Sequence, residues 1–221
     1  MLYEQVAEAV AQATTPPVIV SGDCTTSLGV LTGLQRARHD LAIVWLDAHA
    51  DVHTEASTTS GYLGGLPLAL AVGLGTLTLP EALELRPIPQ SRAMLVDARD
   101  TDPGEQEVLD QSVVTRVRVP DLVDDVLPGG DVYLHVDVDV ADPQDVPGLL
   151  YPAPDGPALT EVLAAVRRVM ATGRVAAVGL ALTWQHKPAN AAAQRGPPPP
   201  AAGQDLTRNQ AIASPTWPEL G

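Results

Sequence analysis

Short apolar runs alternate along this chain with segments of helical periodicity. The runs are rich in Val, Ile and Leu without a clean two-residue alternation, a pattern typical of parallel strands covered on both faces. They lie at residues 17–20, 41–46, 93–96, 113–119, 132–140 and 175–182. The helical patterns between them lie at residues 2–13, 26–38, 65–74, 104–111 and 158–171. This alternation predicts an α/β fold built on an open, mostly parallel sheet.

The last part of the chain differs from the rest. From Gln185 onward no sustained apolar period is present, and residues 197–200 are successive prolines, which favour an extended backbone. We therefore expect residues 1–187 to form one domain and residues 188–221 to form a Pro- and Ala-rich, poorly ordered tail. A length of 221 residues suits a single domain of this class.

The charge of the chain limits its partners. It has 13 Lys and Arg residues against 27 Asp and Glu residues, a formal net charge of -14. This charge repels phosphate backbones and anionic lipids, so we expect neither a nucleic acid nor a membrane as a partner. Cys24 is the single cysteine, which excludes an intramolecular disulfide. The first residues form no basic segment and no window holds about 18 uninterrupted apolar residues, so we expect a cytoplasmic protein.

Two clusters of acidic side chains follow predicted strands. The first is Asp47, His49 and Asp51, and the second is Asp137 and Asp139. Alternate residues of a strand lie on one face, so the members of each cluster are expected to converge. The carboxyl ends of parallel strands also meet at one edge of the sheet, where such sheets bind ligands. Together these donors predict a metal site.

Electrostatics favour a cation at this edge. Carboxylates held together beside an apolar sheet repel one another and lose hydration, so they need either protons or a counter-cation. A donor set rich in oxygen, with one or two imidazoles, suits Mn²⁺ or a similar hard ion. Two alternatives stay open, because a D-x-D at a strand end is also a common cap or turn, and in a nucleotide-sugar transferase it holds a metal and a diphosphate.

These residues carry a family resemblance. The segments VWLDAHAD (44–51), TEASTTSGYLGGLP (54–67) and HVDVD (135–139) resemble the metal motifs of the arginase and agmatinase (ureohydrolase) family, and SGDCTTSLG (21–29) resembles its earlier Gly-Gly-Asp-His motif. The similarity spans residues 17–182, with the motifs in the family's order. It implies an arginase-type three-layer α/β fold, two Mn²⁺ ions and a homo-oligomer, either a trimer or a hexamer. The family normally has a further strand and helix before its first metal motif, so we expect an N-terminally short version of the fold.

The resemblance also implies roles for particular residues. One Mn²⁺ would be held by Cys24, Asp47, Asp51 and Asp137, and the other by Asp47, His49, Asp137 and Asp139. In the family, two cations turn a bridging water into hydroxide, which attacks a guanidinium carbon so that urea leaves. Asp51 would orient this hydroxide and handle its proton. The implied activity is hydrolysis of a linear C–N bond in a small guanidino compound similar to arginine or agmatine.

Several positions depart from the family's pattern. Cys24 stands where the family usually has His, as in a subgroup that acts on hydroxylated arginine, and a thiolate there can still bind a metal. Gly64 stands where arginases have a proton-transferring His. Ala181 and Trp184 stand where the family anchors the guanidinium on Asp and Glu. These departures support an alternative interpretation, an arginase-like metal-binding protein with impaired catalysis.

Three further polar residues lie near these motifs. His53 and Ser60 occupy the loop in which members of the family contact the amino-acid end of the substrate, so they are candidate substrate-binding residues. Their alternative role is loop capping. His135 shares a predicted strand face with Asp137, and we expect it in the core or behind the metal ligands.

Overall fold

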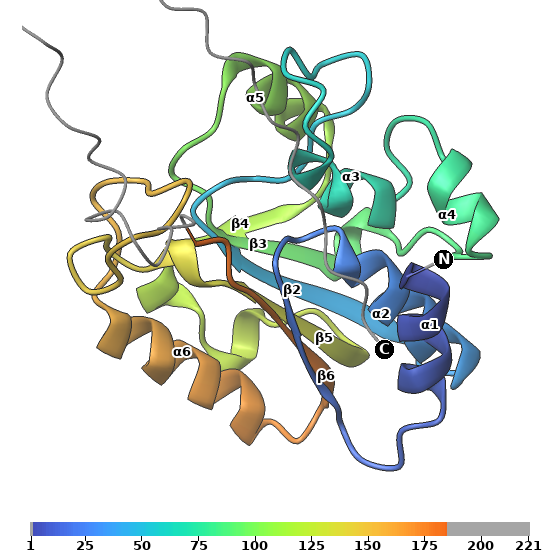
Figure 1. The fold of residues 1–221 in the computed structure, drawn as a ribbon. Helices are drawn as coiled ribbons and strands as arrows, with labels where there is room; N and C mark the ends of the chain where they lie inside the picture. Colours follow the sequence, from blue (N-terminus) through green and yellow to red (C-terminus); the bar gives the residue numbers. More distant parts are fainter. Residues whose placement is uncertain (1, 185–221) are drawn as a thin grey trace, which may run out of the picture. The chain divides into compact units, whose positions relative to one another are not determined.

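A parallel sheet with helices on both faces forms the protein (Figure 1). The computed structural model describes residues 2–184. The strands of this part are β1 (Val18–Ser21), β2 (Leu41–Asp47), β3 (Ala93–Asp97), β4 (Thr115–Val117), β5 (Asp131–Asp137) and β6 (Val175–Ala181). Their order across the sheet is β1-β6-β5-β2-β3-β4, and every pairing is parallel. The predicted α/β fold with a mostly parallel sheet is confirmed.

The helices build one apolar core on each face of the sheet. On one face the core is formed with α1 (Leu2–Ala11), α2 (Thr26–Arg36), α3 (Pro67–Ala71) and α5 (Pro103–Gln111). On the other face it is formed with α6 (Leu159–Ala171) and the short 3-10 helix η3 (Val119–Asp121). Figure 1 shows α1 and α2 across the sheet from α6. The sheet is therefore the middle of three layers.

Strand β2 shows why the apolar runs lack alternation. All its residues are buried. Ile43 and Trp45 pack into the core on the side of α2, whereas Val44 and Leu46 pack into the core on the side of α6. Because both faces need apolar side chains, the strand is one continuous apolar run that ends at the first polar residue, Asp47.

The sequence prediction differs from the structure at some element ends. Residues 138–140, expected as the end of a strand, form the 3-10 helix η5 (Val138–Val140), because the Asp137 side chain accepts a hydrogen bond from the Asp139 amide and tightens the chain there. Strand β4 is shorter than expected. The sequence analysis did not predict the short helices α4 (Thr78–Ala82), η1 (Leu63–Gly65), η2 (Gln90–Arg92) and η4 (Asp124–Val126).

Two further expectations concern the tail and the absence of a membrane-spanning helix. The predicted tail at residues 188–221 lies outside the described residues, and so does the boundary proposed for it. Within residues 2–184, no helix combines the length and the apolar composition needed to cross a membrane.

Candidate metal centre

Cys24, Asp47 and Asp137 converge at the carboxyl edge of the sheet. Asp47 is the last residue of β2 and Asp137 the last of β5, while Cys24 follows β1 and precedes α2 by two residues. The Cys24 Sγ lies 3.2 Å from Asp137 Oδ2 and 3.9 Å from Asp47 Oδ2. All three side chains are buried. A sulfur and two carboxylates from three strands thus meet at one point.

His49 and Asp139 extend this cluster toward solvent. The His49 Nδ1 lies 3.1 Å from Asp139 Oδ2 and 3.4 Å from Asp47 Oδ1. The His49 side chain is 29% exposed, whereas that of Asp139 is 7% exposed. Asp47 therefore lies between the buried thiol on one side and the imidazole on the other, as a bridging ligand must.

Loop geometry, and not a shared strand face, brings these side chains together. Strand β2 ends at Asp47, so His49 and Asp51 lie in the following loop, and Asp139 lies in η5. Asp51 has a left-handed backbone with φ of 54°. Its carbonyl oxygen accepts hydrogen bonds from the amides of Leu68 and Ala69 at the start of α3. A shared strand face was therefore the wrong reason for the convergence within each cluster, whereas the carboxyl edge of the sheet does bring Asp47 and Asp137 together.

Among the described residues, the four acidic side chains of this cluster have one basic partner, His49, which pairs with Asp47 and Asp139. Burial and the neighbouring Asp139 raise the pKa of Asp47 to about 6. Burial, Asp47 and Asp139 raise the pKa of Asp137 to about 8. Burial, Asp47 and Asp137 also raise the pKa of Asp51 well above its ordinary value, and its Oδ2 has no hydrogen-bond partner among the described residues. A divalent cation would satisfy this orphaned oxygen and stabilise the ionised carboxylates, so the residues present fit a metal.

The carboxylates of the cluster also shift the pKa values of the His49 imidazole and the Cys24 thiol. Burial lowers the pKa of His49, but hydrogen bonds to Asp139 and Asp47 outweigh it and raise the pKa to about 11. Burial and the surrounding carboxylates raise the pKa of Cys24 well above its ordinary value. Without a cation, His49 is thus protonated and Cys24 is a thiol. A bound cation would reverse both directions, because metal ligands must be deprotonated.

A cavity of about 270 Å³ opens over the cluster. Eight of its lining residues were not expected at the site: Asp23, Tyr62, Gly65, Asp100, Asp102, Glu105, Tyr151 and Thr183. None of the lining side chains in the described part of the chain belongs to Lys or Arg. Asp100 and Asp102 closely follow β3, so applying the strand-end rule to that strand would have found them. The cavity is therefore acidic at its mouth as well as at its base.

Of the two predicted substrate-binding residues, the structure brings only His53 to the cavity. The His53 Nε2 lies 2.9 Å from Asp102 Oδ2, and its Nδ1 lies 3.0 Å from Ser57 Oγ. Ser60 is exposed and is not among the lining residues, and its hydroxyl oxygen accepts a hydrogen bond from the Tyr62 amide. Both His53 nitrogens are thus engaged by protein groups.

The two positions without the expected acidic residues lie at the end of β6. Ala181 is the last residue of this strand and is buried. The Trp184 side chain is 46% exposed, and its Nε1 donates a hydrogen bond to the Pro147 carbonyl. Between them, Thr183 lines the cavity. The Thr183 hydroxyl donates a hydrogen bond to the Gly22 carbonyl, and the described chain after β6 presents no carboxylate to a bound molecule.

Arg99 fixes the backbone that carries Asp139. Its guanidinium is nearly buried and pairs with Asp97. It also donates hydrogen bonds to the carbonyl oxygens of Asp139, Val140 and Ala153, at 3.1, 2.9 and 2.9 Å. Since a planar guanidinium holds several partners at fixed angles, Arg99 connects β3, η5 and the segment around Ala153.

The ring of Tyr62 occupies the space that a side chain at position 64 would need. A Cβ built on Gly64 would lie 2.4 Å from the Tyr62 ring. We expect Gly64→Ala to cost about 1 kcal/mol of unfolding free energy, the low end for overpacking substitutions, because the half-exposed Tyr62 ring can shift away. In a Tyr62→Ala background the same change should cost much less, because its clash partner is gone.

Urea unfolding of the two single variants and the double variant measures this coupling. Gly129→Ala is the matched control, because nothing lies within 4 Å of a Cβ at that position. Equal costs of Gly64→Ala in both backgrounds would contradict the packing of Tyr62 over Gly64.

The comparisons with known proteins identify the family. A profile described as the Arginase family matches residues 1–181. The arginase of Eremothecium gossypii is 33% identical over 193 residues, covering 80% of this chain and 48% of the relative. The N(omega)-hydroxy-L-arginine amidinohydrolase of Streptomyces lavendulae is 35% identical over 144 residues, covering 63% and 50%. The chain thus spans about half the length of the curated relatives it matches.

Solved structures agree with this match. The native arginase of Bacillus caldovelox superposes with a TM-score of 0.73 at 25% identity, over 81% of this chain and 66% of that one. The Entamoeba histolytica arginase in complex with L-ornithine superposes with a TM-score of 0.69 at 27% identity, over 82% and 66%. The profile match includes every residue of the cluster, from Cys24 to Asp139, and almost the whole sheet that carries it. This chain belongs to the arginase family.

Proposed function

We propose that this protein is a metal-dependent hydrolase that cleaves a linear C–N bond of a guanidino compound. The observation that carries the proposal is the buried convergence of Cys24, Asp47 and Asp137, beside which Asp51 Oδ2 has no hydrogen-bond partner among the described residues. The names of the relatives, arginase and N(omega)-hydroxy-L-arginine amidinohydrolase, support a guanidino substrate. The donor set is rich in oxygen, so we propose two Mn²⁺ ions as the cofactor.

The residues divide between two metal positions. The inner ion would be held by Cys24, Asp47, Asp51 and Asp137, and the outer ion by Asp47, His49, Asp137 and Asp139. When bound, the ions would lower the pKa of a water molecule and so supply a hydroxide nucleophile near neutral pH. Asp51 would bind the inner ion through one carboxylate oxygen and accept the proton on the other.

The mouth of the cavity suits a cationic substrate. The exposed side chains of Asp100 and Asp102 line the cavity, together with Asp23 and the buried Glu105, and among the described lining residues no Lys or Arg opposes them. A guanidinium or ammonium group is attracted by this field before it reaches the cluster. The proposed contact of His53 and Ser60 with the far end of the substrate requires each of them to leave its present partners.

The test uses the full chain, stripped with a chelator and reloaded with Mn²⁺. It is offered arginine, N-hydroxyarginine and agmatine, and release of urea or hydroxyurea is measured. We expect turnover of at least one compound with metal and none without it. Protein that binds two ions per chain and turns over none of these compounds would contradict the proposal.

That negative outcome would instead favour the second candidate, a metal-binding protein with impaired catalysis. Gly64, Ala181 and Trp184 are the observations that favour it, since none of them can transfer a proton or anchor a guanidinium as His, Asp or Glu would. The third candidate, a nucleotide-sugar transferase, predicts tight binding of a nucleoside diphosphate. An acidic cavity repels such an anion, and calorimetry with the diphosphate and Mn²⁺ tests this directly.

The proposed assembly and location complete this function. We propose a cytoplasmic homo-oligomer, either a trimer or a hexamer. Multi-angle light scattering during gel filtration measures the mass, and a monomeric mass at micromolar concentration would overturn the oligomer.

A further inference from the structure

His135 is a buried imidazole held in one orientation. It is 1% exposed, and its ring stacks on Trp45 with a centroid separation of 3.6 Å and an interplanar angle of 20°. Its Nδ1 lies 3.1 Å from Ser27 Oγ and 3.3 Å from Tyr133 OH, two hydroxyls that are 2.8 Å apart. Both the plane of the ring and the environment of one nitrogen are thus fixed.

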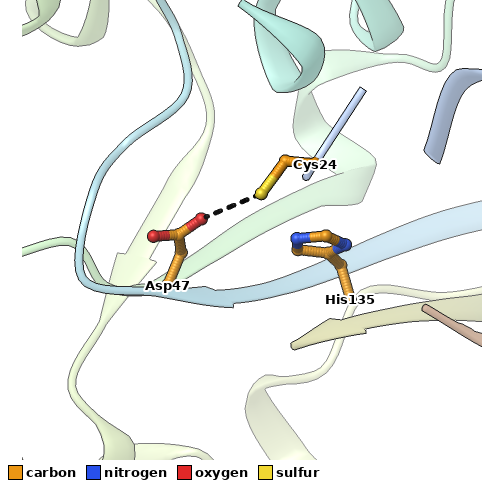
Figure 2. Close-up of side chains that lie close together, drawn as sticks. All are labelled: Cys24, Asp47 and His135. Carbon is orange, nitrogen blue, oxygen red and sulfur yellow. Dashed lines mark hydrogen bonds between the residues drawn. The ribbon is translucent and has the colours of Figure 1, made fainter. Parts of the chain in front are cut away.

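The other nitrogen of this ring has no partner. The His135 Nε2 is buried, and no described residue forms a hydrogen bond with it. Figure 2 shows a ring nitrogen of His135 on the side of Cys24 and Asp47. One donor atom each of Cys24, Asp47 and His135 lie within 4.8 Å of one another. Because ligands bind Zn²⁺ at about 2.0–2.3 Å, donors around one ion lie about 3–4 Å apart, so small side-chain shifts would close this group around an ion.

We propose that Cys24, Asp47 and His135 form a sulfur, oxygen and nitrogen site for a thiophilic divalent ion such as Zn²⁺ or Co²⁺. The proposal rests on the proposed function, because this site is the inner position of the same metal centre. His135 supplies from β5 the imidazole that position 24 lacks. The outer position keeps its oxygen-rich donors and its Mn²⁺, whereas at the inner position the thiophilic ion takes the place of the Mn²⁺ proposed above.

The surroundings of His135 are those of a ligand. A metal-binding imidazole donates its second nitrogen to a neighbouring acceptor, which fixes the tautomer and aims the free lone pair at the metal. Ser27 and Tyr133 offer such acceptors to Nδ1, leaving the Nε2 lone pair on the side of Cys24. Thiolate and imidazole together favour zinc or cobalt over manganese. A histidine with only a packing role would leave this nitrogen unsatisfied at a cost to stability.

Metal titration of the chelator-stripped full chain provides the first test. Zn²⁺ binds most sites more tightly than Mn²⁺, so the diagnostic quantity is the change caused by His135→Gln. We expect this variant to lower the affinity for Zn²⁺ by more than about tenfold and the affinity for Mn²⁺ by much less. The matched control is His39→Gln, which removes an imidazole that pairs with Asp131 away from the cluster and should leave both affinities unchanged.

X-ray absorption of zinc-loaded protein provides the second test and does not depend on the folding of a His135 variant. The test uses His49→Gln protein, because this change removes the imidazole of the outer position. With one equivalent of Zn²⁺, we expect one sulfur donor and one imidazole donor at the metal. A shell of oxygen alone, or of sulfur without imidazole, would overturn the mixed site while leaving the metal centre of the proposed function intact. If the wild-type chain binds neither Zn²⁺ nor Mn²⁺, the proposed function fails together with this inference.

Discussion

Asp137→Asn is expected to lose divalent-metal binding while its metal-free form becomes more stable than the metal-free wild type. Asp137 is proposed to bridge both ions, so the loss of its charge should weaken metal binding by more than about a hundredfold. Removing a group that only hydrogen-bonds to a metal ligand already costs up to about a hundredfold in affinity. In the metal-free protein the same carboxylate is held beside Asp47 and Asp139, which raise its pKa to about 8 together with burial. Removing this charge should add about 2 kcal/mol or more to the unfolding free energy near pH 8.

The two effects have opposite signs, which separates them from simple misfolding. Metal content after gel filtration measures the first, and urea unfolding in chelator measures the second. Asp125→Asn is the matched control, because Asp125 is exposed in η4 and should change neither quantity. Retained metal in Asp137→Asn would contradict the bridging role, and a less stable metal-free protein would contradict the charge repulsion.

The metal-free protein is expected to lose stability as the pH rises from about 4 to about 8. Folding raises the pKa of Asp47 to about 6 and that of Asp137 to about 8, both from an ordinary 3.8. A carboxyl whose pKa is raised holds its proton more tightly in the folded state, so its contribution is full below the unfolded pKa and is lost as the pH rises through the folded one. The pKa of His49 is also raised, from 6.5 to about 11, so its contribution to stability is likewise lost as the pH rises above 6.5.

Bound metal should reverse this trend. Metal affinity increases with pH because the ligands must be deprotonated, and a ligand at a hundredfold excess over its Kd adds about 2.7 kcal/mol. Thermal unfolding in chelator and in excess Mn²⁺ between about pH 5 and pH 8 measures both curves. The pKa values of Asp102 and Glu55 are lowered by folding, so these two carboxyls change the stability only below this pH range. A metal-free curve that rises with pH across the range would show that the cluster is not the dominant titrating group.

The strands could be predicted from the sequence because their signal is local. In β2 each residue is apolar up to Asp47, so the run itself indicates a buried strand and the place where it ends. The parallel direction of the strands could be predicted because they alternate with helices along the chain. The convergence of Asp47 and Asp137 followed in turn, because both stand at carboxyl ends of strands that pair with each other.

The loops could not be predicted because their geometry depends on distant partners. The Asp139 Oδ1 accepts a hydrogen bond from the Ala48 amide, 91 residues away in the sequence. The left-handed backbone of Asp51 is held by amides of α3, and no pattern around Asp51 indicates either contact. His135 was expected in the core or behind the metal ligands for the same reason, since Cys24 and Asp47, whose donor atoms lie near its ring, belong to other parts of the chain.

Cys24 and Asp137 lie 113 residues apart in the sequence, and their side chains meet only where β1 and β5 are both in place. A site of this kind exists only after long loops have closed, the slow part of forming a parallel sheet. An ion that binds it therefore arrives late, after the folding transition state. Bound metal should therefore slow unfolding and leave the folding rate almost unchanged.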